Sequence, residues 1–137
     1  TGMIQREVAQ RMAAAPGSKT YGILSVLMQA WYDVEYLFTV DESVFNPPPK
    51  VKSAVIRMMR NQVNELGCDE RLFKRLVKTV FNQRRKMLRV SIKQMFSKEQ
   101  PASAEFFTLE MMTKRPEQLS VQQFVELTNL VEKELNR

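Results

Sequence analysis

Strand-forming patterns occur in the first sixty residues of this sequence and not after them. Apolar side chains alternate with others from Val34 to Val40, and residues 53–59 are a second run rich in β-branched and apolar side chains. Beyond Arg60 the apolar residues recur only at helical spacing. We therefore predict an α+β fragment with a mixed part at residues 1–60, a linker at 61–68 and a small all-α domain at 69–137.

Two helices are expected in the mixed part. Residues 6–15 and 21–31 have helix-forming composition and flank Pro16-Gly17-Ser18, a cluster that breaks helices. Residues 1–5 before them are typical of the end of a buried strand. The chain therefore starts abruptly inside a strand, and we expect it to be a piece of a longer protein.

Apolar residues recur at helical spacing through the all-α part. They do so over residues 72–81 and again after Arg84-Arg85-Lys86 as far as Phe96, which predicts two amphipathic helices. Ser103 precedes a short helix, and residues 120–123 form a capping box that opens the last one.

Positive charge is concentrated in one stretch of that part. The chain has a formal net charge of +6 and a pI near 9.7, and residues 71–98 hold ten Lys or Arg and no acidic residue. Arg85, Arg89 and Lys93 are four apart, which predicts a cationic stripe along one helical face. Like charges repel at this spacing, so contact with a phosphate backbone is a physical reason for the stripe, and a solvated face is the alternative.

Several function classes are excluded. One cysteine, Cys68, and no histidine rule out an internal disulfide and the usual metal or nucleophile constellations. The longest apolar stretch, residues 23–32, is too short to span a membrane. We expect a soluble cytoplasmic protein with no metal and no membrane partner.

The segment between the two expected strands contains three consecutive prolines, residues 47–49. Prolines cannot join a strand ladder and stiffen the chain, and long rigid loops are frequently functional. Phe45 beside this brace could present a flat face to an extruded base, or it could pack into the core as most loop phenylalanines do.

This segment resembles the motif F-x-P-x-P-K-V-x-S-A-V of the rRNA adenine dimethyltransferases. The stretches from Pro16 to Leu27 and from Phe81 to Arg89, the latter reading F-N-Q-R-R-K-M-L-R, are similar to the KsgA branch of that family, which acts on small-subunit rRNA. The stretch from Met3 to Ala9 is similar to the family's M-L-Q-K-E-V-A. One departure is Lys52, which stands where the family usually has aspartate.

The resemblance implies the tail of a Rossmann-like methyltransferase domain, with two helices and two to three strands, followed by an RNA-contacting helical domain. The intact enzyme would use S-adenosylmethionine (SAM) to dimethylate two adjacent adenosines of small-subunit rRNA, in an immature small ribosomal subunit, as a step of ribosome biogenesis. Phe45 would stack on the target base within a substrate loop that includes Asn46, Pro47, Pro49 and Lys50. The predicted RNA-binding residues are Lys19, Lys78, Arg84, Arg85, Lys86, Arg89 and Lys93.

The sequence lacks the parts that would hold the methyl donor. Its four glycines form no glycine-rich turn after a first strand, and the family's N-[IL]-P-Y signature is missing. We expect no catalytic, SAM-binding or metal-binding residue in this chain, and no activity from it alone. Two rivals remain: an Erm-type methyltransferase of large-subunit rRNA, which shares the F-x-P-x-P loop, and a non-enzymatic RNA-binding or ribosome-assembly module.

Overall fold

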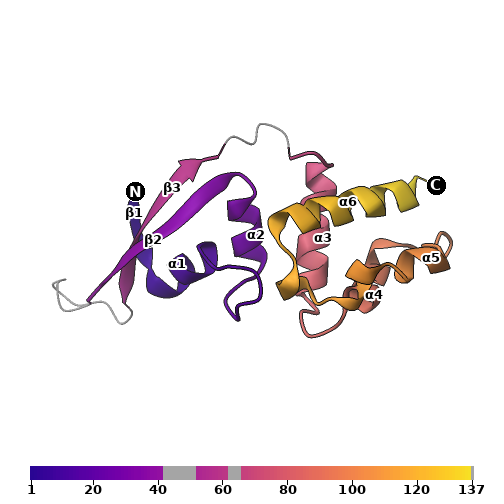
Figure 1. Ribbon diagram of the computed structural model, residues 1–137, viewed down its shortest axis with the longest axis horizontal. Coiled ribbons are helices and arrows are strands. Elements are labelled where there is room, and N and C mark those ends of the chain that lie inside the picture. Colours follow the sequence, from indigo (N-terminus) through magenta and orange to yellow (C-terminus); the bar gives the residue numbers. More distant parts are fainter. Residues whose placement is uncertain (42–51, 62–65, 137) are drawn as a thin grey trace. The chain divides into compact units, whose positions relative to one another are not determined.

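The computed structural model describes residues 1–41, 52–61 and 66–136, and the chain forms two compact units, Thr1–Asn64 and Glu65–Arg137 (Figure 1). Over the described residues, the first unit combines one three-stranded sheet with two helices, and the second contains helices and turns. The α+β class predicted from the sequence is confirmed.

The sheet of the first unit consists of β1 (Gly2–Gln5), β2 (Tyr32–Val40) and β3 (Ser53–Arg60) in the order β1-β3-β2, with both pairings antiparallel. Helices α1 (Arg6–Met12) and α2 (Ile23–Gln29) pack with it. Their shared core is centred on four buried side chains: Ala9, Met12, Ala54 and Ile56.

The expectation that residues 1–5 belong to a buried strand is wrong on burial, although the strand is present. Three of the four residues of β1 are exposed, and Ile4 alone is partly covered because it points toward the core. In this sheet β1 has β3 as its only neighbour, so one of its edges has no partner strand among the described residues.

A bulge in β2 also changes which side chains share a face. The register shifts between Tyr36 and Phe38, so Phe38 pairs with Val55, while Tyr36 packs against the core. Met3 pairs with Val55 from the other side. An apolar row therefore crosses the sheet on the face away from the core, with Met3 (52% exposed) and Phe38 (56%) exposed and Val55 between them half-buried.

The second unit is organised by two long helices, α3 (Glu70–Phe81) and α6 (Val121–Leu135). They pack through buried aromatic rings: the centroids of Phe81 and Phe124 are 5.7 Å apart. The capping box predicted at the start of α6 is confirmed, since Ser120 N donates to Gln123 Oε1 at 2.9 Å and Gln123 N donates to Ser120 Oγ at 3.2 Å.

Short elements connect these two helices. They are α4 (Leu88–Ser91), α5 (Ala104–Phe107) and three 3₁₀ turns, η2 (Ile92–Met95), η3 (Glu110–Thr113) and η4 (Pro116–Gln118). The predicted cap of α5 is confirmed, because Ser103 Oγ accepts from Phe106 N at 3.3 Å.

The predicted continuous helix carrying Arg85, Arg89 and Lys93 on one face is wrong. Residues 82–86 form a turn, α4 is a single turn of helix, and Lys93 lies in η2. The cause is tertiary: Leu88 N, at the start of α4, donates to Lys114 O at 2.8 Å, so the segment is tied to the η3–η4 region. Leu88, Ile92 and Met95 are nevertheless buried, so their spacing correctly predicted burial but not the length of the helix.

Candidate nucleic-acid interface

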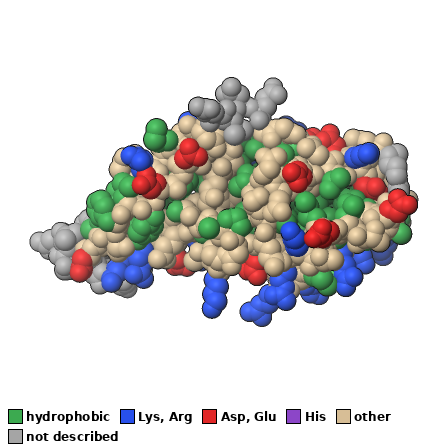
Figure 2. All heavy atoms as spheres, in the orientation of Figure 1, with side chains coloured by type: hydrophobic (Ala, Val, Ile, Leu, Met, Phe, Trp, Pro, Cys, Tyr) green, Lys and Arg blue, Asp and Glu red, His purple; other side chains and the backbone are tan. Residues whose placement is uncertain are grey.

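The basic stretch of the helical unit lies at the surface. Nine of its ten Lys and Arg side chains are exposed, and only Arg84 is partly covered. In Figure 2 many blue side chains of this unit gather along its lower edge. Among the residues that the structure describes, Lys78, Arg85, Lys86 and Arg89 have no ion-pair partner. Their charge is therefore available to an external anion.

Part of this charge surrounds a surface pocket of about 500 Å³. We call it the basic pocket. Its lining combines three cations with one carboxylate and with polar and apolar side chains: Arg85, Lys86, Met87, Val90, Thr113, Arg115, Glu117 and Gln118. Phosphodiester oxygens are acceptors with negative charge, so guanidinium and ammonium groups converging on one depression suit an RNA backbone better than a neutral ligand.

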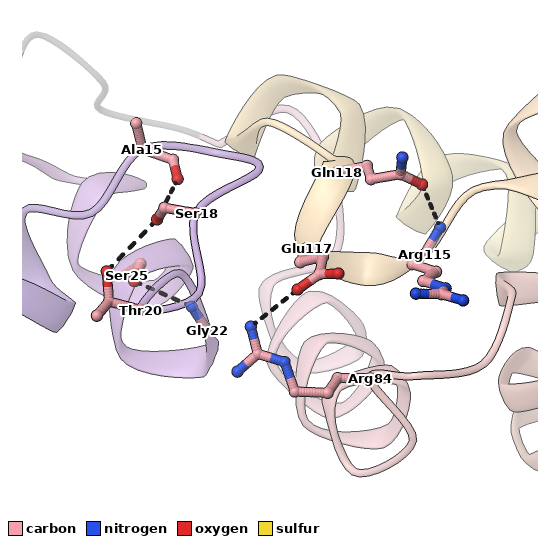
Figure 3. A network of polar contacts seen from close by, with 9 residues as sticks. All are labelled: Ala15, Ser18, Thr20, Gly22, Ser25, Arg84, Arg115, Glu117 and Gln118. Atoms are coloured by element: carbon pink, nitrogen blue, oxygen red, sulfur yellow. Dashed lines mark hydrogen bonds and ion pairs between the residues drawn. The ribbon is translucent and has the colours of Figure 1, made fainter.

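Two separate segments build the basic pocket. The turn after α3 contributes Arg85 and Lys86, and the segment leading into η4 contributes Arg115. A hydrogen bond of 2.8 Å, donated by Leu88 N to Lys114 O, joins the backbones of the two segments. The backbone of Arg115 is fixed in turn, because its N–H donates to Gln118 Oε1 at 2.8 Å (Figure 3).

An ion pair makes a second connection between the segments. Arg84 Nη2 lies 3.3 Å from Glu117 Oε2, with 37% and 29% of the two side chains exposed (Figure 3). Glu117 is the carboxylate of the basic pocket, and this contact partly neutralises it. The pocket therefore keeps an excess of positive charge.

The other predicted RNA-binding residues lie apart from the pocket lining. Lys78 on α3 and Arg89 on α4 are exposed, and Lys93 Nζ lies 5.7 Å from the centroid of the Phe107 ring. Lys19 belongs to the first unit, where it is exposed in the loop between α1 and α2. The substrate loop residues Phe45, Asn46, Pro47, Pro49 and Lys50 are outside the described residues.

Sequence reasoning missed Arg115. It lies thirty residues beyond Arg85, in a region where acidic residues outnumber basic ones, so no local charge run marks it. The available signal was the pair Lys114-Arg115 directly before Pro116, which places two cations at the entrance of a turn.

Comparisons with known proteins identify the family of this chain. Residues 1–133 match the family described as ribosomal RNA adenine dimethylase. The chain belongs to this family. It is 70% identical over 132 residues to a ribosomal RNA small subunit methyltransferase A of Phocaeicola vulgatus, a match that covers 96% of this chain and 46% of that protein. A protein of the same name from Parabacteroides distasonis is 64% identical over 137 residues, covering 100% of this chain and 50% of the relative.

The family predicted from the sequence is thus confirmed, and these curated relatives carry the small-subunit name. The chain spans about half the length of the curated relatives it matches.

Solved structures confirm the fold. A dimethyladenosine transferase from Plasmodium falciparum superposes with a TM-score of 0.81 at 24% identity, over 96% of this chain and 56% of that one. The 23S rRNA methyltransferase ErmE gives a TM-score of 0.55 at 18% identity, over 93% and 53% of the two chains. The described part of the chain thus has a fold found in rRNA methyltransferases.

The described residues do not fit a SAM site. A Rossmann-like site needs a glycine-rich turn between a strand and the helix that follows it, and among the described residues β1 runs from Gln5 directly into α1 at Arg6 without such a turn. The two glycines with positive φ, Gly17 (89°) and Gly67 (88°), lie in the α1–α2 loop and before α3.

Neither a cluster of metal ligands nor a membrane-spanning helix occurs among the described residues. Across residues 1–41, 52–61 and 66–136, three or more Cys, Asp or Glu side chains nowhere gather as metal ligands would. Each helix of the same residues is too short or too polar to cross a bilayer.

Proposed function

We propose that this chain supplies the rRNA-contacting surface of a SAM-dependent adenine N6,N6-dimethyltransferase of small-subunit rRNA. Residues 1–60 form the end of the Rossmann-like methyltransferase domain, 61–68 the linker and 69–137 the RNA-contacting domain. The observation that carries the proposal is the basic pocket, in which Arg85, Lys86 and Arg115 converge from two segments. Family membership supports the reaction, because the curated relatives are named as small-subunit rRNA methyltransferases.

The proposed division of labour follows from charge. Arg85, Lys86 and Arg115 bind phosphates and position the RNA, and they carry no base specificity. Arg89 and Lys78 extend this contact at the surface outside the pocket. The natural substrate is an immature small ribosomal subunit in the cytoplasm, where the rRNA offers both the phosphates and the target adenosines.

Chemistry at the base is assigned to the substrate loop. Asp41 and Lys52 flank it at the ends of β2 and β3, two strands held in register by their ladder. The proposed role of Phe45 is to stack on the extruded adenine, with Asn46, Pro47, Pro49 and Lys50 shaping the loop. The methyl donor would be held by other parts of the complete enzyme, since the described residues here do not fit it.

The small-subunit substrate is preferred over the Erm-type alternative. The relatives that are 64% and 70% identical carry the small-subunit name, whereas ErmE shares 18% identity. A non-enzymatic assembly module would need the same pocket, so methylation by the complete protein separates that alternative from the proposal.

The test is a salt titration of RNA binding by the 137-residue chain. The probe is a transcript of the 3′ domain of small-subunit rRNA, and the variant carries Arg85→Gln, Lys86→Gln and Arg115→Gln. Each lost phosphate contact lowers the slope of log K against log [salt] by about 0.9, so the variant should lose about 2.7. Lys133→Gln, an exposed cation of α6 that does not line the pocket, is the control and should lower the slope by less than about 0.5. A triple variant with the wild-type slope would refute the proposal.

A further inference from the structure

Arg84 differs from its two basic neighbours in the turn after α3. Arg85 and Lys86 are exposed and line the basic pocket, whereas Arg84 is partly covered and is absent from the lining. Its guanidinium carbon lies 5.9 Å from the centroid of the Phe81 ring, and its Nη2 atom lies 3.3 Å from Glu117 Oε2. Arg84 is therefore already engaged inside the protein.

The position of Glu117 gives this ion pair a mechanical consequence. Glu117 lies in η4, two residues after Arg115, and it lines the pocket itself. The pair fastens the turn that carries Arg85 and Lys86 to the segment that carries Arg115 (Figure 3). Together with Leu88 N–Lys114 O, it makes two ties between the walls of the pocket.

We propose that Arg84 and Glu117 are positioning residues, which hold the walls of the basic pocket at the separation that RNA binding needs, and that Arg84 does not itself bind phosphate. This inference rests on the proposed function, because it concerns the same pocket. On this account the Glu117 carboxylate favours the binding of a polyanion, whereas its negative charge alone would oppose that binding.

The two accounts predict opposite signs for the loss of the Glu117 charge. If charge alone mattered, removing a carboxylate next to the bound phosphate would tighten binding by about two- to threefold in screened solvent. If the pair positions the walls, removing the acceptor costs about one phosphate contact, which is about eightfold in Kd at 0.1 M salt.

A charge-matched pair of variants separates these accounts. Glu117→Ala and Glu117→Gln carry the same charge, but the glutamine still offers Arg84 an Oε1 acceptor. Kd for the small-subunit rRNA transcript is measured with the 137-residue chain, alongside thermal unfolding by circular dichroism. We expect Glu117→Ala to bind about three- to fourfold more weakly than wild type, because the eightfold cost of the lost contact exceeds the two- to threefold gain from the lost charge. We expect Glu117→Gln to bind at least about threefold more tightly than Glu117→Ala. Equal affinity of the two variants, whether above or below wild type, would overturn the inference.

A double-variant cycle keeps the test decisive if Glu117→Ala lowers stability. A positioning Arg84 acts through Glu117, so adding Arg84→Gln to Glu117→Ala, where the pair is already lost, should change Kd much less than Arg84→Gln changes it in the wild-type chain. Any loss of stability caused by Glu117→Ala is common to the two variants compared in that background. An arginine that binds phosphate directly would cost the same factor in both backgrounds, which would refute the inference. The triple variant of Arg85, Lys86 and Arg115 distinguishes failure of the proposed function from failure of this inference. If the triple variant binds RNA like wild type, the proposed function fails, independently of the results for the Glu117 variants.

Discussion

Tyr21 should make the first unit sensitive to alkaline pH. Its side chain is fully buried, and this burial raises the pKa of the Tyr21 hydroxyl from 10.0 to about 12. Between these values the unfolded chain releases the proton while the native chain keeps it, so stability is complete below pH 10 and is lost as pH rises toward 12. One pKa unit corresponds to about 1.4 kcal/mol, so the loss is about 1.4 kcal/mol at pH 11 and approaches about 2.7 kcal/mol above pH 12.

Urea unfolding at pH 8 and pH 11 measures this loss. Trp31, the single tryptophan of the chain, lies in the first unit and reports on its unfolding by fluorescence. With a slope of about 1 kcal/mol/M for a unit of this size, the wild-type midpoint should fall by about 1.4 M more than that of Tyr21→Phe. The phenylalanine variant keeps the buried ring and lacks the titrating group, and it accounts for every other residue that ionises in this range. Equal shifts in the two proteins would refute the reasoning.

Three further outcomes are expected. Phe124→Ala removes a fully buried ring that packs on Phe81 and should lower the free energy of unfolding by about 3–5 kcal/mol. Val90→Ala, at a side chain that is 40% exposed, should lower it by less than about 1 kcal/mol. Thermal unfolding measures both losses, and equal losses would contradict the packing described. Phe45→Ala in the complete enzyme should reduce methylation far more than RNA affinity, and unchanged activity would favour a core role for this ring. Calorimetry of the 137-residue chain with SAM should show no binding, and saturable binding would show that the chain holds a donor site.

Local signals in the sequence predicted the elements that depend on local chemistry. The Ser120 capping box needs two hydrogen bonds within four residues, so its residues sufficed to place the start of α6. The alternation over residues 34–40 placed β2 for the same reason. It did not predict that Phe38 leaves the core face, because the bulge depends on the pairing of β2 with β3.

The same limit explains the error over residues 85–96. Apolar periodicity identified Leu88, Ile92 and Met95 as buried, which is correct. It did not reveal that the chain breaks into a turn, α4 and η2, since the break is fixed by a hydrogen bond from Leu88 to Lys114, twenty-six residues away. Apolar spacing in a sequence therefore predicts which side chains are buried more reliably than it predicts the secondary structure that connects them.

This difference changes how the cations can act on RNA. On a continuous helix, Arg85 and Arg89 would be about 6 Å apart along the axis, in a stripe that follows a run of phosphates. In the folded chain Arg85 and Lys86 lie in a turn and meet Arg115 around one pocket, while Arg89 stays outside it. Three charges around one depression concentrate the potential on a few adjacent phosphates of a sharply bent backbone. The basic stretch is thus better suited to fixing one point of a folded RNA than to following the length of a duplex, and the ties made by Arg84 and Leu88 are what turn a charge run into such a point.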